Sequence, residues 1–254
     1  MKSKHFSISL AELEKIPQPF GWKVEYYDDQ AHITPRDMAI RTKLDIHPIV
    51  KTSTYNLQPI DAGYKQQMIE VFYQSFLDSA EFCDWTKKDL RKHADRNINN
   101  YFIGFRGQPL TQSVMAIEPK TKQVIGLALF LIHRKQHYEL DLLLVNPKYQ
   151  RQGLATAMVS HVTQQLHEQG ITELYSFYHI CNELSRNWHQ KFGFKEEYTA
   201  SFVRLKCAWY RDEIWRLGKL GLMEDLPELI REQDYWLRIL QSEDLRQDFW
   251  WDDD

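Results

Sequence analysis

The sequence has little of what marks several classes of protein. Among its 254 residues are three cysteines, Cys83, Cys181 and Cys207, which lie far apart and form no C-x-x-C pair. This spacing indicates neither a zinc ribbon nor a redox motif, and three free thiols are typical of a reducing compartment. The longest strongly apolar run, residues 124–132, is too short to cross a bilayer as a helix. We therefore expect a cytoplasmic protein without a membrane partner.

The sequence also has little excess of charge of either sign. The formal net charge is -3 and the sequence pI is about 6.4. The chain thus has no general excess of positive charge for binding nucleic acid, and we expect none as a partner. His133 and His137 flank a turn and could imitate a metal-binding pair, but no third ligand stands at a suitable spacing. We expect no metal.

The residues that are present divide the chain into three expected segments. The first, residues 1–52, starts with a short helical pattern that stops at Pro17. Two stretches of alternating apolar residues, Trp22 to Tyr27 and Ala31 to Thr34, then flank a polar turn and predict a β-hairpin. This segment is too short to bury a large core by itself, so we expect a small appended module.

The middle segment, residues 53–207, carries most of the regular pattern. Leu154, Met158, Val162 and Leu166 recur at four-residue spacing and should face a sheet. Hairpins followed by a strand–helix–strand unit predict an α/β fold with a mixed, mostly antiparallel central sheet and flanking helices. The expected strands cover residues 56–60, 113–118, 124–133, 138–145, 173–178 and 201–207, and the expected helices cover residues 64–76, 86–97, 156–169 and 183–191.

The last segment, residues 208–254, is expected to be a helical extension. Leucines and isoleucines between residues 226 and 240 form an apolar stripe at helical spacing. We expect the tryptophans of this segment in a core or at an interface, since an exposed apolar patch would require a partner. A homodimer through the terminal segments is one such arrangement. The tryptophans are Trp209, Trp215, Trp236, Trp250 and Trp251.

The stretch from Val145 to Thr156 gives the clearest chemical signal. An apolar strand stops at Pro147, a short basic loop follows, and Gly153 opens an amphipathic helix. The first backbone amides of a helix lack internal partners and lie at its positive end, which favours an anion such as a pyrophosphate. Gly153 lets phosphate oxygens approach the backbone without a Cβ in the way, and Arg151 can contact phosphates directly.

Two other phosphate loops can be excluded. A Walker loop needs Lys-Ser or Lys-Thr after its last glycine, whereas Leu154-Ala155-Thr156 follows here. The dinucleotide fingerprint needs three spaced glycines, and this loop has one.

Instead, Gln150-x-x-Gly153-x-Ala155 resembles the Q/R-x-x-G-x-G/A motif of the GNAT superfamily of acetyltransferases. A second stretch resembles the family's N-x-x-A-x-x-L-Y-E-x-x-G-F helix and turn, and both stand in the family's order. The resemblance covers about residues 53–207 and implies a GNAT-like fold with acetyl-coenzyme A as cosubstrate. The matching residues of the second stretch are Asn182, Ser185, Trp188 and Phe192-Gly193-Phe194.

The resemblance also implies roles for single residues. The strand ending at Val145 would splay from residues 174–178 and admit the pantetheine arm of the coenzyme. The Val145 amide would polarise the thioester carbonyl, and Asn182 would bind the arm or fix the loop beside it. The loop starting with Gln150 would hold the pyrophosphate through the amides of Arg151, Gln152, Gly153, Leu154, Ala155 and Thr156.

Acyl transfer to an amine needs a group that removes a proton from the amine. With period-two alternation, Glu139, Asp141, Leu143 and Val145 share one face of their strand. Glu139 matches the position of a catalytic glutamate in several GNAT enzymes and is the first candidate base, with Asp141 the second. The alternative is a solvated carboxylate at the strand end. His189 stands where the family often has a tyrosine that protonates the leaving thiolate, so it either takes that role or merely packs.

Three functions follow in order of preference. The first is an enzyme that moves an acetyl group from acetyl-coenzyme A directly to a primary amine of a small molecule or protein. The second is an acyl-coenzyme A sensor that keeps the cradle without the chemistry. The third is an interaction protein assembled through the terminal segments. Loops and edges, here residues 78–101 and the two terminal segments, would choose the acceptor amine, which the sequence does not identify.

Overall fold

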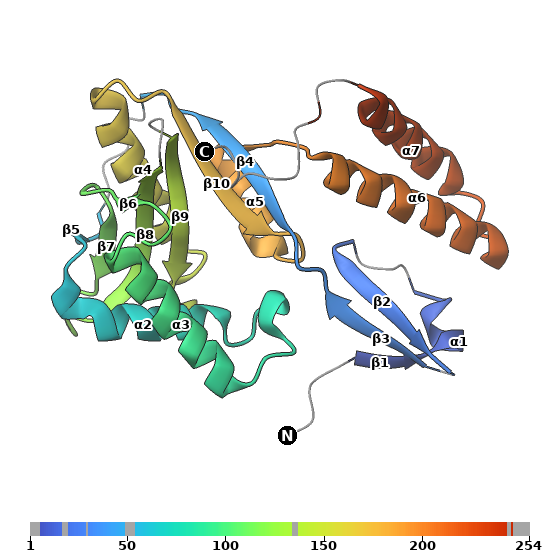
Figure 1. Ribbon diagram of the computed structural model, residues 1–254, viewed down its shortest axis with the longest axis horizontal. Coiled ribbons are helices and arrows are strands. Elements are labelled where there is room, and N and C mark those ends of the chain that lie inside the picture. Colours follow the sequence, from blue (N-terminus) through green and yellow to red (C-terminus); the bar gives the residue numbers. More distant parts are fainter. Residues whose placement is uncertain are drawn as a thin grey trace. The chain divides into compact units, whose positions relative to one another are not determined.

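The computed structural model describes residues 6–16, 20–28, 30–48, 54–133, 137–242 and 245. These residues form two compact units (Figure 1). The first unit comprises Thr42–Tyr178 and Asn182–Lys195, and the second comprises the described residues of Lys4–Arg41, His179–Cys181 and Glu196–Asp254. Trp250, Trp251 and the acidic residues 252–254 lie outside the described residues.

The first unit is built on an eight-stranded sheet. The strand order is β11-β4-β10-β9-β8-β7-β5, and β6 pairs with β8 beside this path. Strands β5 to β9 pair antiparallel, whereas β10 is parallel to β9, which confirms the predicted mixed, mostly antiparallel sheet. The strands are β4 (Ala39–Asp45), β5 (Leu57–Pro59), β6 (Gln108–Pro109), β7 (Val114–Ile117), β8 (Val124–His133), β9 (His137–Val145), β10 (Glu173–His179) and β11 (Lys195–Glu196).

Helices pack on both faces of this sheet. One core cluster joins the sheet to α2 and α3 through residues such as Phe72, Ile98 and Leu129. The other joins it to α4 and includes the predicted stripe from Leu154 to Leu166, whose four members are at most 1% exposed. The helices are α2 (Lys65–Phe76), α3 (Lys87–Phe102), α4 (Leu154–Glu168) and α5 (Glu183–Phe192), with short 3-10 turns η1 (Ala62–Tyr64), η2 (Ala80–Phe82) and η4 (Pro147–Tyr149).

The second unit contains the predicted hairpin. β2 (Trp22–Tyr27) pairs antiparallel with β3 (Gln30–Pro35), as expected, and β1 (Phe6–Ser9) adds to the other edge of β3. A capping box between Ser9 and Glu12 starts the short helix α1 (Leu10–Leu13). Two longer helices, α6 (Ala200–Leu220) and α7 (Leu226–Gln241), pack on each other.

The predicted strand over residues 201–207 is wrong, because these residues are the start of α6. The Thr199 side chain accepts a hydrogen bond from the amide of Phe202 at 3.2 Å and caps the helix. Apolar and polar residues alternate here over only seven positions, whereas apolar residues at helical spacing continue to Leu217, and the longer pattern prevails. The helix is continuous across residue 207, while the division into segments 1–52, 53–207 and 208–254 stays a prediction.

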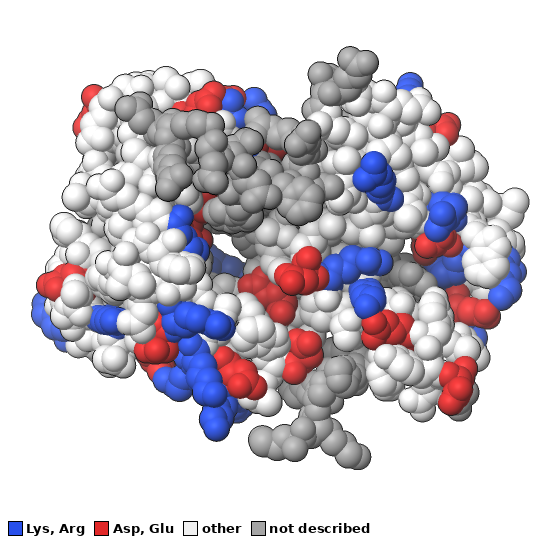
Figure 2. Space-filling model, in the orientation of Figure 1, with Lys and Arg blue, Asp and Glu red and all other residues white. Residues whose placement is uncertain are grey.

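The tryptophans of the last segment have different surroundings. Trp236 is buried in α7 at 6% exposure, whereas Trp215 on α6 is 66% exposed. A dimer through the terminal segments remains a prediction. None of the helices in the described part of the chain is both long and apolar enough to cross a membrane. Acidic and basic side chains are interspersed on the face shown in Figure 2, in agreement with the small net charge.

Candidate functional site

The loop before α4 has the backbone of an anion cradle. Arg151 and Gly153 have positive φ angles of 60° and 84°, and Gln152 between them does not. Alternation of this kind turns successive N–H groups toward one point and makes an anion-binding nest. Upstream, the Asn146 side chain accepts from the Lys148 amide at 3.1 Å and starts the 3-10 turn that leads into the loop.

The start of α4 adds further donors to this nest. Its first helical hydrogen bond runs from the Ala157 amide to the Gly153 carbonyl at 2.9 Å. The amides of Leu154, Ala155 and Thr156 therefore precede the helical ladder, at the positive end of the helix. A Cβ placed on Gly153 would meet no described atom within 4 Å. The space at the Cβ position of Gly153, beside the first amides of α4, is thus open, and a side chain would occupy it.

Side chains brace the loop from behind. Gln150 donates from Nε2 to the Val145 carbonyl at 3.1 Å, and Gln152 donates from Nε2 to the Lys148 carbonyl at 3.0 Å. Tyr55 donates to the Gln152 carbonyl. These bonds use the side chains of Gln150 and Gln152 within the protein, so the backbone amides are the groups that remain to bind a ligand.

Beside this loop, β9 and β10 separate. Within the described residues the two parallel strands pair in register only at Glu139 with Tyr175 and at Leu140 with Ser176. The Asn146 amide donates to the β8 carbonyl of Ile125 at 2.9 Å. Since bonding direction alternates along an antiparallel strand, the amides of residues 143 and 145 face away from β8, toward β10. The amide of Val145 therefore faces the place where β9 separates from β10.

A β-bulge changes the predicted face of Glu139 and Asp141. Leu129 pairs with Leu142 but Phe130 pairs with Leu140, so Asp141 is an extra residue. The side-chain alternation of β9 reverses at this point. The two carboxylates consequently do not share a face with Leu143 and Val145, which pack in the α4 cluster. The sequence prediction of a single face was wrong because a bulge shifts the pleat by one residue.

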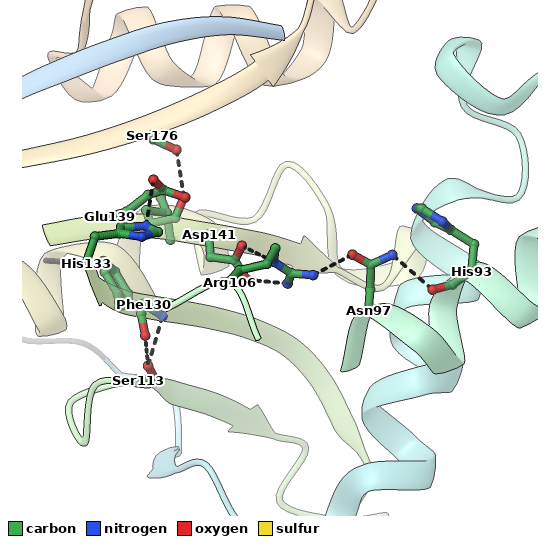
Figure 3. A network of polar contacts seen from close by, with 10 residues as sticks. His93, Asn97, Arg106, Ser113, Phe130, His133, Glu139, Asp141 and Ser176 are labelled. Carbon is green, nitrogen blue, oxygen red and sulfur yellow. Dashed lines mark hydrogen bonds and ion pairs between the residues drawn. The ribbon is translucent and has the colours of Figure 1, made fainter. Parts of the chain in front are cut away.

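Both carboxylates have basic partners: Arg106 binds Asp141, and the His133 imidazole contacts Glu139 (Figure 3). Arg106 holds Asp141 with two parallel bonds, at 2.8 Å from Nε and 2.6 Å from Nη2, and donates a third at 2.9 Å to Asn97 of α3. Burial raises the pKa of Asp141, and the Arg106 guanidinium opposes this rise. Glu139 lies 3.1 Å from His133 Nε2. This contact raises the pKa of His133 against the effect of burial.

His189 lies in the interior of the unit. Its Nδ1 is 2.8 Å from the Ser185 carbonyl, which can only accept, so Nδ1 carries the ring proton. Nε2 lies 3.0 Å from the Ser176 hydroxyl. With 3% of the residue exposed, burial lowers the pKa of His189 to about 4. A neutral imidazole with both nitrogens engaged has the surroundings of a packing residue.

These surroundings predict an acid-sensitive fold. The unfolded imidazole, with a pKa near 6.5, binds a proton more readily than folded His189. The free energy of unfolding should therefore decrease as the pH falls from about 6.5 toward 4, by up to about 3 kcal/mol. Urea unfolding at pH 7.5 and pH 5 measures this loss in the wild type and in His189→Phe. The variant should lose less stability between the two pH values, and equal losses would contradict the assignment.

Asn182 lies at the start of α5. Its Oδ1 accepts from the Ser185 amide at 3.0 Å and caps the helix, and its Nδ2 donates to Glu81 Oε2 at 3.2 Å. Burial raises the pKa of Glu81 to about 7, although the Asn182 hydrogen bond opposes the rise. Glu81 lies within residues 78–101, which are predicted to help choose the acceptor, but no motif of the sequence distinguishes it there. Its position one residue before Phe82 is the signal that could have found it, although Asp78 and Asp84 in the same stretch offer the same chemistry.

The described residues contain no group of three or more His, Cys, Asp or Glu side chains that could hold a metal ion. The candidate site combines a backbone anion cradle, two amides facing a gap between strands, and nearby carboxyl groups.

Part of the chain matches a known protein family. Residues 69–194 match the model of the Acetyltransferase (GNAT) family. No curated protein matches the sequence.

Several solved structures are similar to part of the chain. An N-acetyltransferase related to GCN5, from Sphaerobacter thermophilus, shares 12% identity over 63% of this chain and 48% of its own, with a TM-score of 0.43. This chain thus matches about half the length of that protein. The PaiA N-acetyltransferase of Thermoplasma acidophilum, solved with coenzyme A, shares 18% identity over 58% and 93%, with a TM-score of 0.44. A GNAT-family acetyltransferase of Staphylococcus aureus shares 17% identity over 56% and 85%, with a TM-score of 0.43.

Proposed function

Because residues 69–194 of this chain are an acetyltransferase domain of the GNAT family, we propose that the protein transfers an acetyl group from acetyl-coenzyme A to a primary amine. The observation that carries the proposal is the nest of backbone amides from Arg151 to Thr156. It is a site for an anion, it lies next to the gap between β9 and β10, and its open side is kept free of side chains by Gly153.

The residues present fit the coenzyme. The amides of residues 151–156 would hold its diphosphate, and exposed Arg151 adds a positive charge at the rim. The amides of residues 143 and 145 face the gap and would donate to the pantetheine arm and to the thioester carbonyl. A donor fixed in place before the reaction stabilises the negative charge that develops on that oxygen. Asn182, at the start of α5, would border the arm.

The structure changes which side chains we assign to the chemistry. His189 is neutral and enclosed, so we do not give it the role of proton donor to the leaving thiolate. Asp141 accepts hydrogen bonds from both Nε and Nη2 of Arg106, so it is not free to take a proton from an amine. Glu139 keeps its place as a candidate base, in contact with His133.

A direct assay tests the proposal. Purified protein is mixed with acetyl-coenzyme A and a panel of primary amines, including phenethylamine, spermidine and peptides with free lysines or N-termini. Release of free thiol should depend on the amine, and mass spectrometry should detect the acetylated acceptor. Tight binding of acetyl-coenzyme A without turnover of any amine would contradict transfer and leave only the binding site.

A further inference from the structure

The segment between α2 and α3 crosses the end of the gap between β9 and β10. At one end of this segment, Ser75 in the last turn of α2 donates to the Val145 carbonyl at 3.1 Å, where β9 ends. At the other, Glu81 accepts from Asn182, which starts α5 three residues after β10. These two hydrogen bonds fix the segment at the carboxyl ends of both strands. Glu81 therefore lies next to Asn182, the residue that would border the proposed coenzyme arm.

Glu81 has apolar neighbours and is half-buried. The next residue, Phe82, packs its ring edge-on against Phe76 at 5.2 Å and against Trp85 at 5.0 Å between centroids. Burial, more than any neighbouring charge, raises the pKa of Glu81 to about 7. With a pKa near 7, about half of the Glu81 carboxyl groups are ionised at neutral pH, and the ionised form still binds a proton well. The titratable residues that flank the contact are Asp78, Cys83 and Asp84 on the same segment and Glu183 on α5.

The partner of Glu81 distinguishes it from the two carboxylates on β9. Asp141 is paired with a guanidinium and Glu139 with an imidazole. The hydrogen bond to Glu81 comes from the neutral amide of Asn182. A carboxylate bound by an amide keeps its negative charge uncompensated, and it attracts an ammonium group more strongly than one that is already paired with a cation.

We propose that Glu81 is the proton acceptor for the amine in this transfer and that Asn182 positions its carboxyl group. This inference rests on the proposed function. Glu81 removes one proton from the ammonium form of the acceptor. The freed lone pair on nitrogen forms the C–N bond, and the C–S bond breaks with its electron pair moving to sulfur. The second proton leaves the nitrogen and ends on the thiolate, while Glu81 returns its proton to water.

The variant Glu81→Gln tests the proposal, with Glu70→Gln on the surface of α2 as its matched control, since Glu70 also accepts from a side-chain amide, that of Gln74. Glutamine keeps an oxygen that can accept from Asn182, so the segment should stay in place. We expect Glu81→Gln to lower kcat by at least about 100-fold, the low end of the usual contribution of a general base. Its Kd for acetyl-coenzyme A, measured by calorimetry, should stay within about threefold of the wild-type value, because such a base acts on the amine and not on the coenzyme. Glu70→Gln should lose less than about fivefold in kcat, because its carboxylate is 47% exposed and is bound by Arg91 on the protein surface.

The pH dependence separates a catalytic role from a structural one. The wild-type kcat should decrease as the pH falls through about 7, because protonated Glu81 cannot accept a proton. The profile of Glu81→Gln should lack this limb. A full kcat with an unchanged profile in Glu81→Gln, or a larger loss in Glu139→Gln, would overturn the assignment to Glu81. Failure of the wild type to acetylate any amine would instead overturn the proposed transfer, and this inference with it.

A second readout needs no activity. Folded Glu81 binds its proton more tightly than the unfolded chain, so wild-type stability should decrease as the pH rises from about 4.5 to 7. Glutamine carries no charge at either pH. The denaturation midpoint of Glu81→Gln, relative to that of the wild type, should therefore be higher at pH 8 than at pH 5. A difference that does not change with pH would show that Glu81 does not hold a proton near neutrality, and would overturn the proposal.

Discussion

Gly153→Val is expected to weaken binding of acetyl-coenzyme A by at least about 100-fold, or about 2.7 kcal/mol of binding free energy. The valine methyl groups would stand in the open space before the amides of residues 151–156, where the structure has no atom within 4 Å of a Cβ. A β-branched residue also resists the φ of 84° that gives the nest its shape. Isothermal calorimetry with acetyl-coenzyme A and with desulfo-coenzyme A measures the loss.

Gly170→Val is the matched control. Gly170 follows the other end of α4, has a φ of 81° and also has open space at its Cβ position. Both substitutions therefore carry similar backbone strain, and both should lower the thermal midpoint by a similar amount. Only Gly153 lies at the cradle, so Gly170→Val should bind the coenzyme as the wild type does. Equal affinities in the two variants would place the diphosphate elsewhere.

The cradle could be predicted from the sequence because every part of it is local. A strand that stops at Pro147, a glycine that permits a positive φ and an apolar stripe that starts at Leu154 all lie within a dozen residues. Local patterns of this kind determine where a helix begins and which face it buries. The structure differs only in detail, with α4 beginning at Leu154, two residues before the expected start.

The surroundings of the carboxylates could not be predicted in this way. The bulge at Asp141 depends on how β8 pairs with β9, and no single residue in either strand marks it. Arg106 lies 35 positions from Asp141 in the chain, and Glu81 lies 101 positions from Asn182. Contacts between residues so far apart in the chain depend on the packed fold. The periodicity of apolar residues in the sequence therefore identifies candidate catalytic carboxylates but not the residues that bind them.

The same distinction explains the errors in the outline of the fold. No strand was predicted over residues 39–45, although β4 lies between β10 and β11 in the large sheet. Ile40, Thr42 and Leu44 are below 8% exposure, but so is Arg41, and the partners of β4 are more than 130 positions away in the chain. Residues 201–207 alternate as a strand does, yet the capping residue Thr199 and the longer helical pattern prevail.

Arg106→Met is expected to lower the free energy of unfolding by about 3–5 kcal/mol at pH 8, because it leaves a buried carboxylate without its cation. Asp141 has a 7% exposed side chain and loses two charge-assisted bonds. Without the guanidinium, burial alone sets the pKa of Asp141, which should rise further. The destabilisation should therefore shrink as the pH falls and the folded carboxyl group takes up a proton. Chemical denaturation at pH 8 and pH 5 measures both effects.

The double variant Arg106→Met, Asp141→Leu separates the pair from its parts. Removing both charges should restore most of the stability that Arg106→Met loses, because the unpaired charge and not the missing ion pair is the main cost. Lys195→Met is the surface control, since its bond to Asp45 joins side chains that are 79% and 47% exposed. It should change the stability by less than about 1 kcal/mol. If the double variant is as unstable as Arg106→Met, the guanidinium holds the loop after α3 by its packing and its bond to Asn97, and the charge of Asp141 is secondary.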